Sequence, residues 1–204
     1  MPPCAPARIV VLASGTGSLL EALLAAAAEP GYPGAVVGVV ADRTCRALEV
    51  AAAGSIDTAE VPLKAYEDRA AWDEALAAAV AELEPHLVVA AGFMKILGPA
   101  FLAAFGGRVI NAHPALLPAF PGAHAVPAAL EYGVTLTGST VHLVDAGLDT
   151  GPILAQEAVA VQPGDTEETL HERIKVVERR LLTEVVAAVA RQGYSTDGRK
   201  VTIP

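Results

Sequence analysis

Short apolar runs alternate with longer stretches rich in Ala, Leu and Glu through the first half of the chain. Apolar runs bounded by Gly, Pro or polar residues are typical of strands that are buried on both faces. The pattern predicts strands over 9–13, 35–40, 57–61 and 86–91, and helices over 19–29, 45–53 and 67–83. This alternation indicates an α/β fold: a doubly wound, mostly parallel sheet with helices on both faces.

The pattern changes in the second half of the chain. It predicts strands over 108–111, 137–144 and 153–161, helices over 123–132 and 167–191, a Pro-rich loop over 114–122, and an edge strand over 200–203. Asp165 and Thr166 are a plausible capping start for the long helix. Because no linker rich in Gly, Ser or charge divides the chain, we expect one domain over residues 1–204.

Composition narrows the class of protein. The 204 residues carry 14 basic and 23 acidic side chains, a net charge of −9, which argues against wrapping a nucleic-acid backbone but not against a local anion site. Cys4 and Cys45 are too few for a disulfide framework or a cysteine zinc site and fit a reducing cytoplasm. We expect no signal peptide and no membrane span, which would need roughly 20 consecutive apolar residues.

A glycine loop, residues 14–18 (Ser-Gly-Thr-Gly-Ser), separates the first predicted strand from the first predicted helix. Glycines allow the backbone to approach a ligand, and a helix start presents amide donors to an anion. However, Leu20 stands where the dinucleotide fingerprint has its third glycine, and the Walker lysine is absent. The segment is therefore either a phosphate site or an ordinary strand-to-helix turn.

Asn111 and His113 alternate on a strand, so both side chains point the same way at its carboxyl end. Open α/β sheets bind their ligands there, and Pro114 and Pro118 stiffen the loop that follows. Asp149, in a Gly/Asp-rich loop, could orient His113 and favour its imidazolium form. The alternatives are a surface histidine, a turn-forming asparagine and a turn aspartate.

The sequence gives weaker evidence for a catalytic or binding role of the other histidines. We expect His86 and His142 to be structural and His171 to lie on a solvated helix face, whereas His124 could reach a pocket. No metal-site spacing of the H-E-x-x-H or C-x-x-C type occurs, and no G-x-S-x-G elbow, so neither a metal nor serine acyl transfer is predicted.

Taken together, these segments resemble the folate-dependent formyltransferase family. Residues 111–118 (Asn-Ala-His-Pro-Ala-Leu-Leu-Pro) resemble the family's Asn-x-His-Pro-Ser-Leu-Leu-Pro signature, and Asp149 falls in a loop resembling that of the catalytic aspartate. Residues 14–18 match the family's phosphate loop. Residues 91–97 are similar to a folate-site segment, although Lys95 stands where arginine is common. The resemblance runs from about Ile9 to Leu182.

The resemblance implies a single formyltransferase domain, a Rossmann variant with a nucleotide-phosphate half at about 8–100 and a folate and catalytic half at about 101–192. It implies transfer of the formyl group of 10-formyltetrahydrofolate to the amine of glycinamide ribonucleotide, giving formylglycinamide ribonucleotide in de novo purine synthesis. The implied catalytic residues are Asn111, His113 and Asp149. The implied ribonucleotide contacts are Gly15, Thr16, Gly17, Ser18, Leu19 and Glu178. The implied folate contacts are Arg69, Met94, Lys95, Ile96, Leu97, Asn111, Val144, Asp145, Leu148 and Asp149.

Two of these assignments stay open. Leu19 departs from the asparagine often found there, so it would offer a backbone amide at most. Glu178 would face the substrate amine, but its many charged neighbours on the last helix also suit a solvated surface charge. In the implied reaction, Asn111 and the imidazolium of His113 donate to the oxyanion, and Asp149 relays the proton that leaves the amine.

Three other functions compete with this interpretation. Formyltetrahydrofolate deformylases typically carry an extra amino-terminal domain, for which a strand starting by Ile9 leaves no room. Methionyl-tRNA formyltransferases carry a further carboxyl-terminal domain and bind RNA, which a net charge of −9 disfavours. A non-catalytic nucleotide-binding module would not need Asn111, His113 and Asp149 together. We expect the two substrates as ligands, no nucleic acid, no membrane and no metal, while a homodimer is neither required nor excluded.

Overall fold

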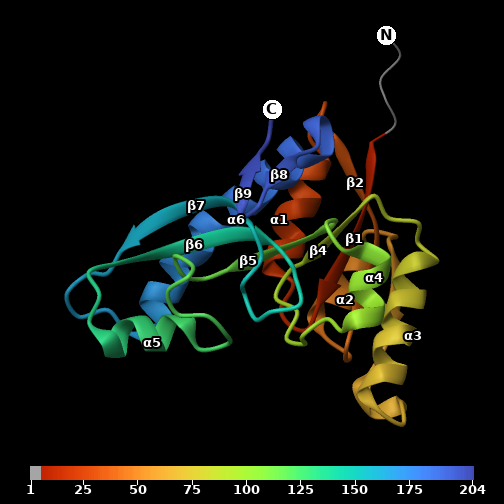
Figure 1. Ribbon diagram of the computed structural model, residues 1–204, viewed down its shortest axis with the longest axis horizontal. Helices are drawn as coiled ribbons and strands as arrows, with labels where there is room; N and C mark the ends of the chain where they lie inside the picture. Colours follow the sequence, from red (N-terminus) through yellow and green to blue (C-terminus); the bar gives the residue numbers. More distant parts are fainter. Residues whose placement is uncertain (1–5) are drawn as a thin grey trace. The chain divides into compact units, whose positions relative to one another are not determined.

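The computed structural model describes residues 6–204, so Cys4 lies outside the described residues. The chain divides into two compact units, the first ending at Ile110 and the second starting at Asn111 (Figure 1). The expectation of one formyltransferase domain over 1–204 stays a prediction. From residue 6 onwards, no helix is both long and apolar enough to cross a membrane.

The first unit is built on a parallel sheet. Strands β1 (Ala7–Ala13), β2 (Gly34–Ala41), β3 (Asp57–Glu60) and β4 (Leu87–Ala90) lie in the order β3-β2-β1-β4. Every adjacent pair among them is parallel, and Val11 of β1 lies opposite Val39 on one side and Val89 on the other. Because β1 is central, Ile9, Val10 and Leu12 are completely buried, as the continuous apolar run predicts.

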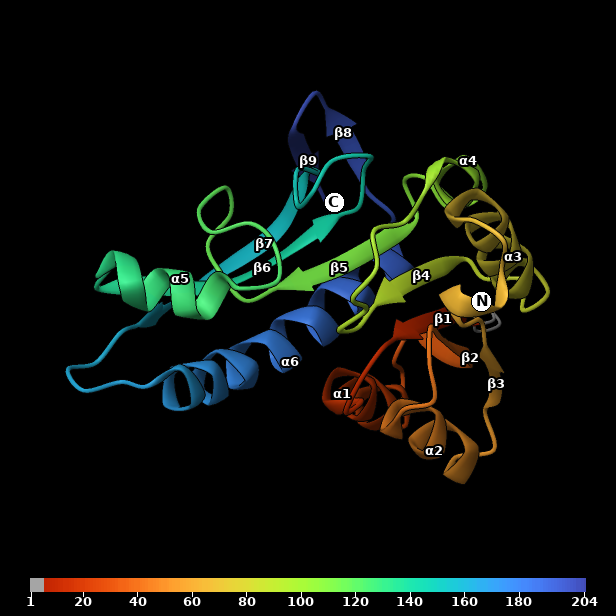
Figure 2. The same cartoon turned by 90° about the horizontal axis from the view of Figure 1, so that it is seen from below.

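Helices cover both faces of this sheet. The helices of the first unit are α1 (Ser18–Ala27), α2 (Arg46–Ala53), α3 (Arg69–Ala81) and α4 (Pro99–Phe105), with a short 3₁₀ turn over Leu63–Ala65. Figure 2 shows α1 and α2 on one face and α3 and α4 on the other. The predicted α/β class, a mostly parallel sheet with flanking helices, is therefore confirmed.

Helix α4 was not predicted from the sequence, because its capping group comes from another helix. The carboxylate of Asp73, buried in α3, accepts hydrogen bonds from the backbone N–H groups of Gly98, Ala100 and Phe101. These are orphan donors at the start of α4, and a capping carboxylate satisfies them. A side chain at Gly98 would collide with that carboxylate, since an added Cβ would lie 2.5 Å from it.

Strand β5 (Val109–His113) spans the boundary between the units. The second unit continues with α5 (Ala125–Tyr132), β6 (Leu136–Leu143), β7 (Ile153–Ala160), α6 (Glu167–Gln192), β8 (Ser195–Asp197) and β9 (Lys200–Thr202). Its strands run in the order β6-β7-β9-β8, with β6 antiparallel to β7. The predicted tail strand therefore exists as β9, but the unpredicted β8 pairs with its outer side and forms the edge.

The core of the second unit lies between α5, α6 and the sheet. It includes the buried side chains of Val126, Val159, Leu170 and Ile174. The Thr166 side chain caps the start of α6 by accepting from the backbone N–H of Thr169, as the sequence predicts. This packing holds α6 against the strands of the second unit.

Candidate active site

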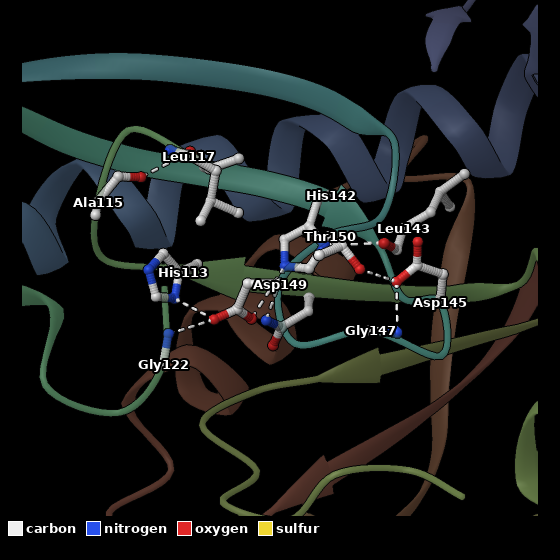
Figure 3. A network of polar contacts seen from close by, with 12 residues as sticks. His113, Ala115, Leu117, Gly122, His142, Leu143, Asp145, Gly147, Asp149 and Thr150 are labelled. Carbon is white, nitrogen blue, oxygen red and sulfur yellow. Dashed lines mark hydrogen bonds and ion pairs between the residues drawn. The ribbon is translucent and has the colours of Figure 1, made fainter. Parts of the chain in front are cut away.

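A cluster of polar side chains lies at the carboxyl end of β5 and in the elements beside it in the second unit (Figure 3). Asn111 and His113 come from β5, His142 from β6, and Asp149 from the loop between β6 and β7. Asp149 lies between the rings of His113 and His142. The structure thus brings together three residues selected from the sequence and one, His142, that we expected to be structural.

His113 is buried, and both of its ring nitrogens face protein groups. Its Nε2 lies 2.8 Å from the carbonyl oxygen of Phe120, so Nε2 carries a hydrogen and donates it. Its Nδ1 lies 3.4 Å from Oδ2 of Asp149, which also accepts the backbone N–H of Gly122 at 2.7 Å. The Asp149 carboxylate therefore faces this ring nitrogen and can orient the imidazole.

His142 was expected to be a hydrogen-bonded core histidine, and it is indeed buried. Its partners, however, belong to the cluster: Nε2 lies 3.1 Å from Nδ2 of Asn111 and 3.7 Å from Oδ1 of Asp149. Burial lowers the pKa of His142 below its ordinary value, although the Leu143 carbonyl and the Asp149 charge oppose that shift. At neutral pH this ring is therefore uncharged.

The loop between β6 and β7 is built to present Asp149. Asp149 itself has a φ of 53°, in the left-handed region that aspartate tolerates better than most residues. A Cβ at Gly151 would lie 1.7 Å from the carbonyl oxygen of Leu143, so only glycine fits there. Oδ1 of Asp145 accepts from Gly147 N–H and Thr150 O–H at 3.1 and 2.6 Å. Asp145, selected as a folate contact, thus also braces this loop.

The loop that follows His113 is held by residues that sequence reasoning missed. Oγ1 of Thr140, buried on β6, donates to the carbonyl of Ala115 and accepts the N–H of Leu117. Nε2 of Gln156, on β7, donates both to the Leu117 carbonyl and to Thr140 Oγ1. Side chains of two strands therefore fix this loop in addition to its prolines. The sequence gives no local signal for such long-range bonds.

In the first unit, backbone carbonyl groups of the glycine loop accept hydrogen bonds from neighbouring residues. The carbonyl of Gly15 accepts the N–H of Ala47, and the carbonyl of Thr16 accepts from the guanidinium of Arg46 at 2.7 Å. Gly17 has a φ of 77°, and a Cβ there would lie 3.0 Å from Cα of Ala47. Within residues 6–204, the N–H groups of residues 18–20 donate to no backbone carbonyl. These free donors at the start of α1 suit an anion.

Leu19 is buried with its side chain in the core, so only its backbone is available to a ligand. Arg69 lies at the start of α3, donates to the carbonyl of Ile96, and stacks over the Trp72 ring at 4.8 Å. Met94 and Ile96 are 64% and 58% exposed, which leaves apolar surface for a ligand. In the second unit, Leu148 is likewise exposed, at 53%.

A buried aspartate anchors the segment over 92–97. The Asp42 carboxylate, at the end of β2, lies 3.4 Å from Nζ of Lys95 and 2.8 Å from the guanidinium of Arg43. Ser14 hydrogen-bonds to Asp42 and accepts the backbone N–H of Met94 at 2.8 Å. Burial alone would raise the pKa of Asp42, but these hydrogen bonds and charges lower it. Asp42, which sequence reasoning missed, therefore stays ionised opposite Lys95.

The structure excludes one of the two interpretations of Glu178 that the sequence left open. Glu178 is 6% exposed in α6, so it is not a solvated surface charge. Burial raises its pKa to about 7, against the opposing charges of Lys175 and Arg179. The spacing could have indicated this, because Glu178 falls four residues after Ile174 and four before Leu182 on the apolar stripe of the helix.

The remaining candidates lie outside the cluster. His124 is exposed at the start of α5, and Nδ1 of His86 accepts the backbone N–H of Arg8 at 2.9 Å. His171 is half-buried rather than fully solvated. Among the described residues, no group of three His, Cys, Asp or Glu side chains is placed to hold a metal ion.

Comparison with known proteins finds relatives that match the chain over most of its length. The sequence profile of the family described as Formyl transferase matches residues 7–186. The chain is 62% identical to a phosphoribosylglycinamide formyltransferase of Mycobacterium tuberculosis, over 100% of this chain and 97% of that protein. It is similar to the crystal structure of glycinamide ribonucleotide transformylase 1 from Symbiobacterium toebii, with a TM-score of 0.94, 42% identity, and coverage of 97% and 94%. A formyltetrahydrofolate deformylase from Pseudomonas syringae has a TM-score of 0.91 at 25% identity, covering 98% of this chain and 67% of the deformylase.

Proposed function

Because the chain belongs to the formyl transferase family, we propose that it transfers the formyl group of 10-formyltetrahydrofolate to the amine of glycinamide ribonucleotide. The observation that carries the proposal is the cluster of Asn111, His113 and Asp149, in a chain that matches relatives named for this activity along its whole length. The ribonucleotide product enters purine synthesis.

The bond that forms joins the amine nitrogen to the formyl carbon, and the bond that breaks joins that carbon to N10 of the folate. One proton leaves the amine and one reaches N10. Negative charge develops on the formyl oxygen during the attack, and donors aimed at that position lower the barrier. Asn111 supplies such a donor, since one N–H of its amide faces His142 and the other is left for the substrate.

We assign the proton transfers of this reaction to His113 and Asp149. The carboxylate of Asp149 orients His113 and accepts the proton that leaves the amine, directly or through water. The Nε2–H of His113 donates to the Phe120 carbonyl in this structure. It reaches the formyl oxygen only by exchanging that bond for one to the substrate.

Glu178 suits the recognition of an amine. It is a buried carboxyl group whose pKa of about 7 reflects the absence of a compensating partner. An amine supplies N–H donors and, when protonated, a positive charge, and either one stabilises the ionised carboxylate. We assign the free N–H groups at the start of α1, with Gly17 and Ser18, to the ribonucleotide phosphate.

The folate contacts selected from the sequence fit the chemistry of a folate in each unit taken by itself. In the first unit, the exposed apolar side chains of Met94 and Ile96 offer surface for a flat ring system, and Arg69 offers a positive charge for a carboxylate. In the second unit, Leu148 is likewise an exposed apolar side chain. Folate here is a co-substrate, and the protein groups bind and orient it. A cytoplasmic location is part of the proposal.

An absorbance assay for the tetrahydrofolate product, with and without glycinamide ribonucleotide, tests this function. The proposal predicts turnover that requires the ribonucleotide. Turnover that does not depend on the ribonucleotide would assign the chain to hydrolysis, as in the deformylase that it resembles in fold. Absence of turnover under both conditions would indicate a binding module.

A further inference from the structure

We propose that His142 is a positioning residue: as a neutral ring with its hydrogen on Nδ1, it accepts an N–H of Asn111 and thereby fixes which way the Asn111 amide faces. The inference rests on the proposed function and extends it to a residue with no role assigned above. It is carried by two hydrogen bonds, one at each ring nitrogen.

The first bond fixes the tautomer of the ring. Nδ1 of His142 lies 2.9 Å from the carbonyl oxygen of Leu143. A carbonyl oxygen can only accept, so Nδ1 must carry the hydrogen. In the neutral ring Nε2 then has none and can only accept. The ring is 2% exposed and cannot turn to exchange these partners for water.

The second bond fixes the amide. Nδ2 of Asn111 lies 3.1 Å from Nε2 of His142, and an amide nitrogen can only donate. If the amide were turned over, its oxygen would face the lone pair of Nε2, and two acceptors would oppose each other. The ring therefore selects one orientation, in which Asn111 keeps its second N–H for the formyl oxygen.

The charges around His142 explain why its neutral form matters. The ionisable groups that face the ring are Asp149, His113 and Asp145. Burial favours the neutral ring and a charge on His113 adds to that effect, while the two carboxylates oppose it. A protonated His142 would present N–H to Asn111, force the amide over, and compete with His113 for Asp149, whose Oδ1 lies 3.7 Å away.

The wild-type protein provides the first test, by long-range ¹H–¹⁵N NMR of its histidines and asparagine amides at neutral pH. We expect His142 to carry its hydrogen on Nδ1, and one side-chain N–H proton of Asn111 to show the downfield shift of a hydrogen bond. His86 is an internal control with the opposite tautomer, because its Nδ1 accepts from Arg8. A hydrogen on Nε2 of neutral His142 would overturn the proposal.

Variants supply the second test. His142→Leu removes the acceptor and should lower kcat by about 100-fold, as expected when a catalytic group is misplaced, with little change in either KM. His142→Gln can present Oε1 where Nε2 lies, so it should recover most of kcat and the shifted Asn111 signal. His86→Gln is the matched control and should keep full activity.

Each outcome supports or overturns the positioning role of His142. Equal kcat in wild type and His142→Leu, or equal losses in the Leu and Gln variants with an unchanged Asn111 signal, would overturn the positioning role. If His142→Leu does not fold, the wild-type tautomer and the Gln variant decide. A wild-type protein without turnover would contradict the proposed function instead, and the spectra would still report on the hydrogen bond.

Discussion

Nδ1 of His113 lies 3.4 Å from Oδ2 of Asp149, and both side chains are largely withdrawn from solvent. Charges in such surroundings are weakly screened, so the Asp149 carboxylate interacts strongly with the His113 ring. The backbone N–H of Gly122 donates to the same carboxylate oxygen and holds it in place. This relationship underlies the first prediction.

Asp149→Asn should lower kcat by orders of magnitude, comparable to the ~10⁴-fold loss when another catalytic histidine loses its carboxylate. The asparagine keeps the shape and an acceptor for Gly122 but removes the negative charge that faces the His113 ring. Residues that act as a unit are non-additive, so His113→Ala with Asp149→Asn should be little worse than the poorer single variant. Steady-state kinetics of the four proteins measures this, and fully multiplicative losses would show that the two residues act separately.

Glu178 should make stability depend on pH. Burial raises its pKa from 4.5 to about 7, so between these values the folded protein holds a proton that the unfolded chain has released. The free energy of unfolding should therefore fall as pH rises through this window, and it should stay lower above pH 7. The pKa change corresponds to about 3 kcal/mol.

Urea unfolding at pH 5 and pH 8 measures this dependence. Glu178→Gln should be more stable than wild type at pH 8 and close to it at pH 5. Glu184→Gln, at an exposed carboxylate on the same helix, is the control and should change stability little at either pH. A Glu178→Gln variant that tracks wild type at both values would mean that the carboxyl group is solvated after all.

Gly17→Val should raise the KM for the ribonucleotide much more than the KM for the folate. A side chain at this position is strained by the φ of 77° and approaches Ala47 at 3.0 Å, so the loop must shift. Gly15→Ala is the control for crowding, since an added Cβ there has no atom within 4 Å. Equal changes in the two KM values would argue against a phosphate at this loop.

Substitutions of Asp42 and Lys95 should raise the KM for the folate more than the KM for the ribonucleotide. Asp42→Asn removes the charge that faces Lys95 and weakens the anchor of the 92–97 segment, so the folate KM should rise. Lys95→Met should behave in the same way, whereas Lys95→Arg keeps the pair and should retain most of the affinity. Similar folate KM values in Lys95→Met and Lys95→Arg would show that the ion pair has no such role.

Much of the fold could be predicted because its signals are local. The apolar run from Ile9 to Leu12 predicts β1, and the turn at Gly54 ends α2 where the sequence indicates. Helix α4 escaped prediction because it is short and its cap is Asp73, which lies in another helix. No window of sequence contains both the helix and the group that stabilises its start.

The cluster was predictable only in part, for the same reason. Asn111 and His113 share one short segment, so their alternation on a strand indicated a site. The sequence around His142 does not indicate its proposed role, because that role depends on the direction of its two hydrogen bonds. Glu178 lies among charged neighbours, and only its place on the apolar stripe of α6 reveals that it is buried.

The destination of the formyl carbon tests the central claim most directly. 10-Formyltetrahydrofolate labelled with ¹³C in the formyl group is incubated with glycinamide ribonucleotide and the wild-type protein, and the label is followed by NMR. We expect the signal to move to an amide carbon attached to the glycinamide nitrogen, and Asp149→Asn to slow this change by orders of magnitude. Appearance of the label as free formate, at the same rate with or without the ribonucleotide, would contradict the proposed function.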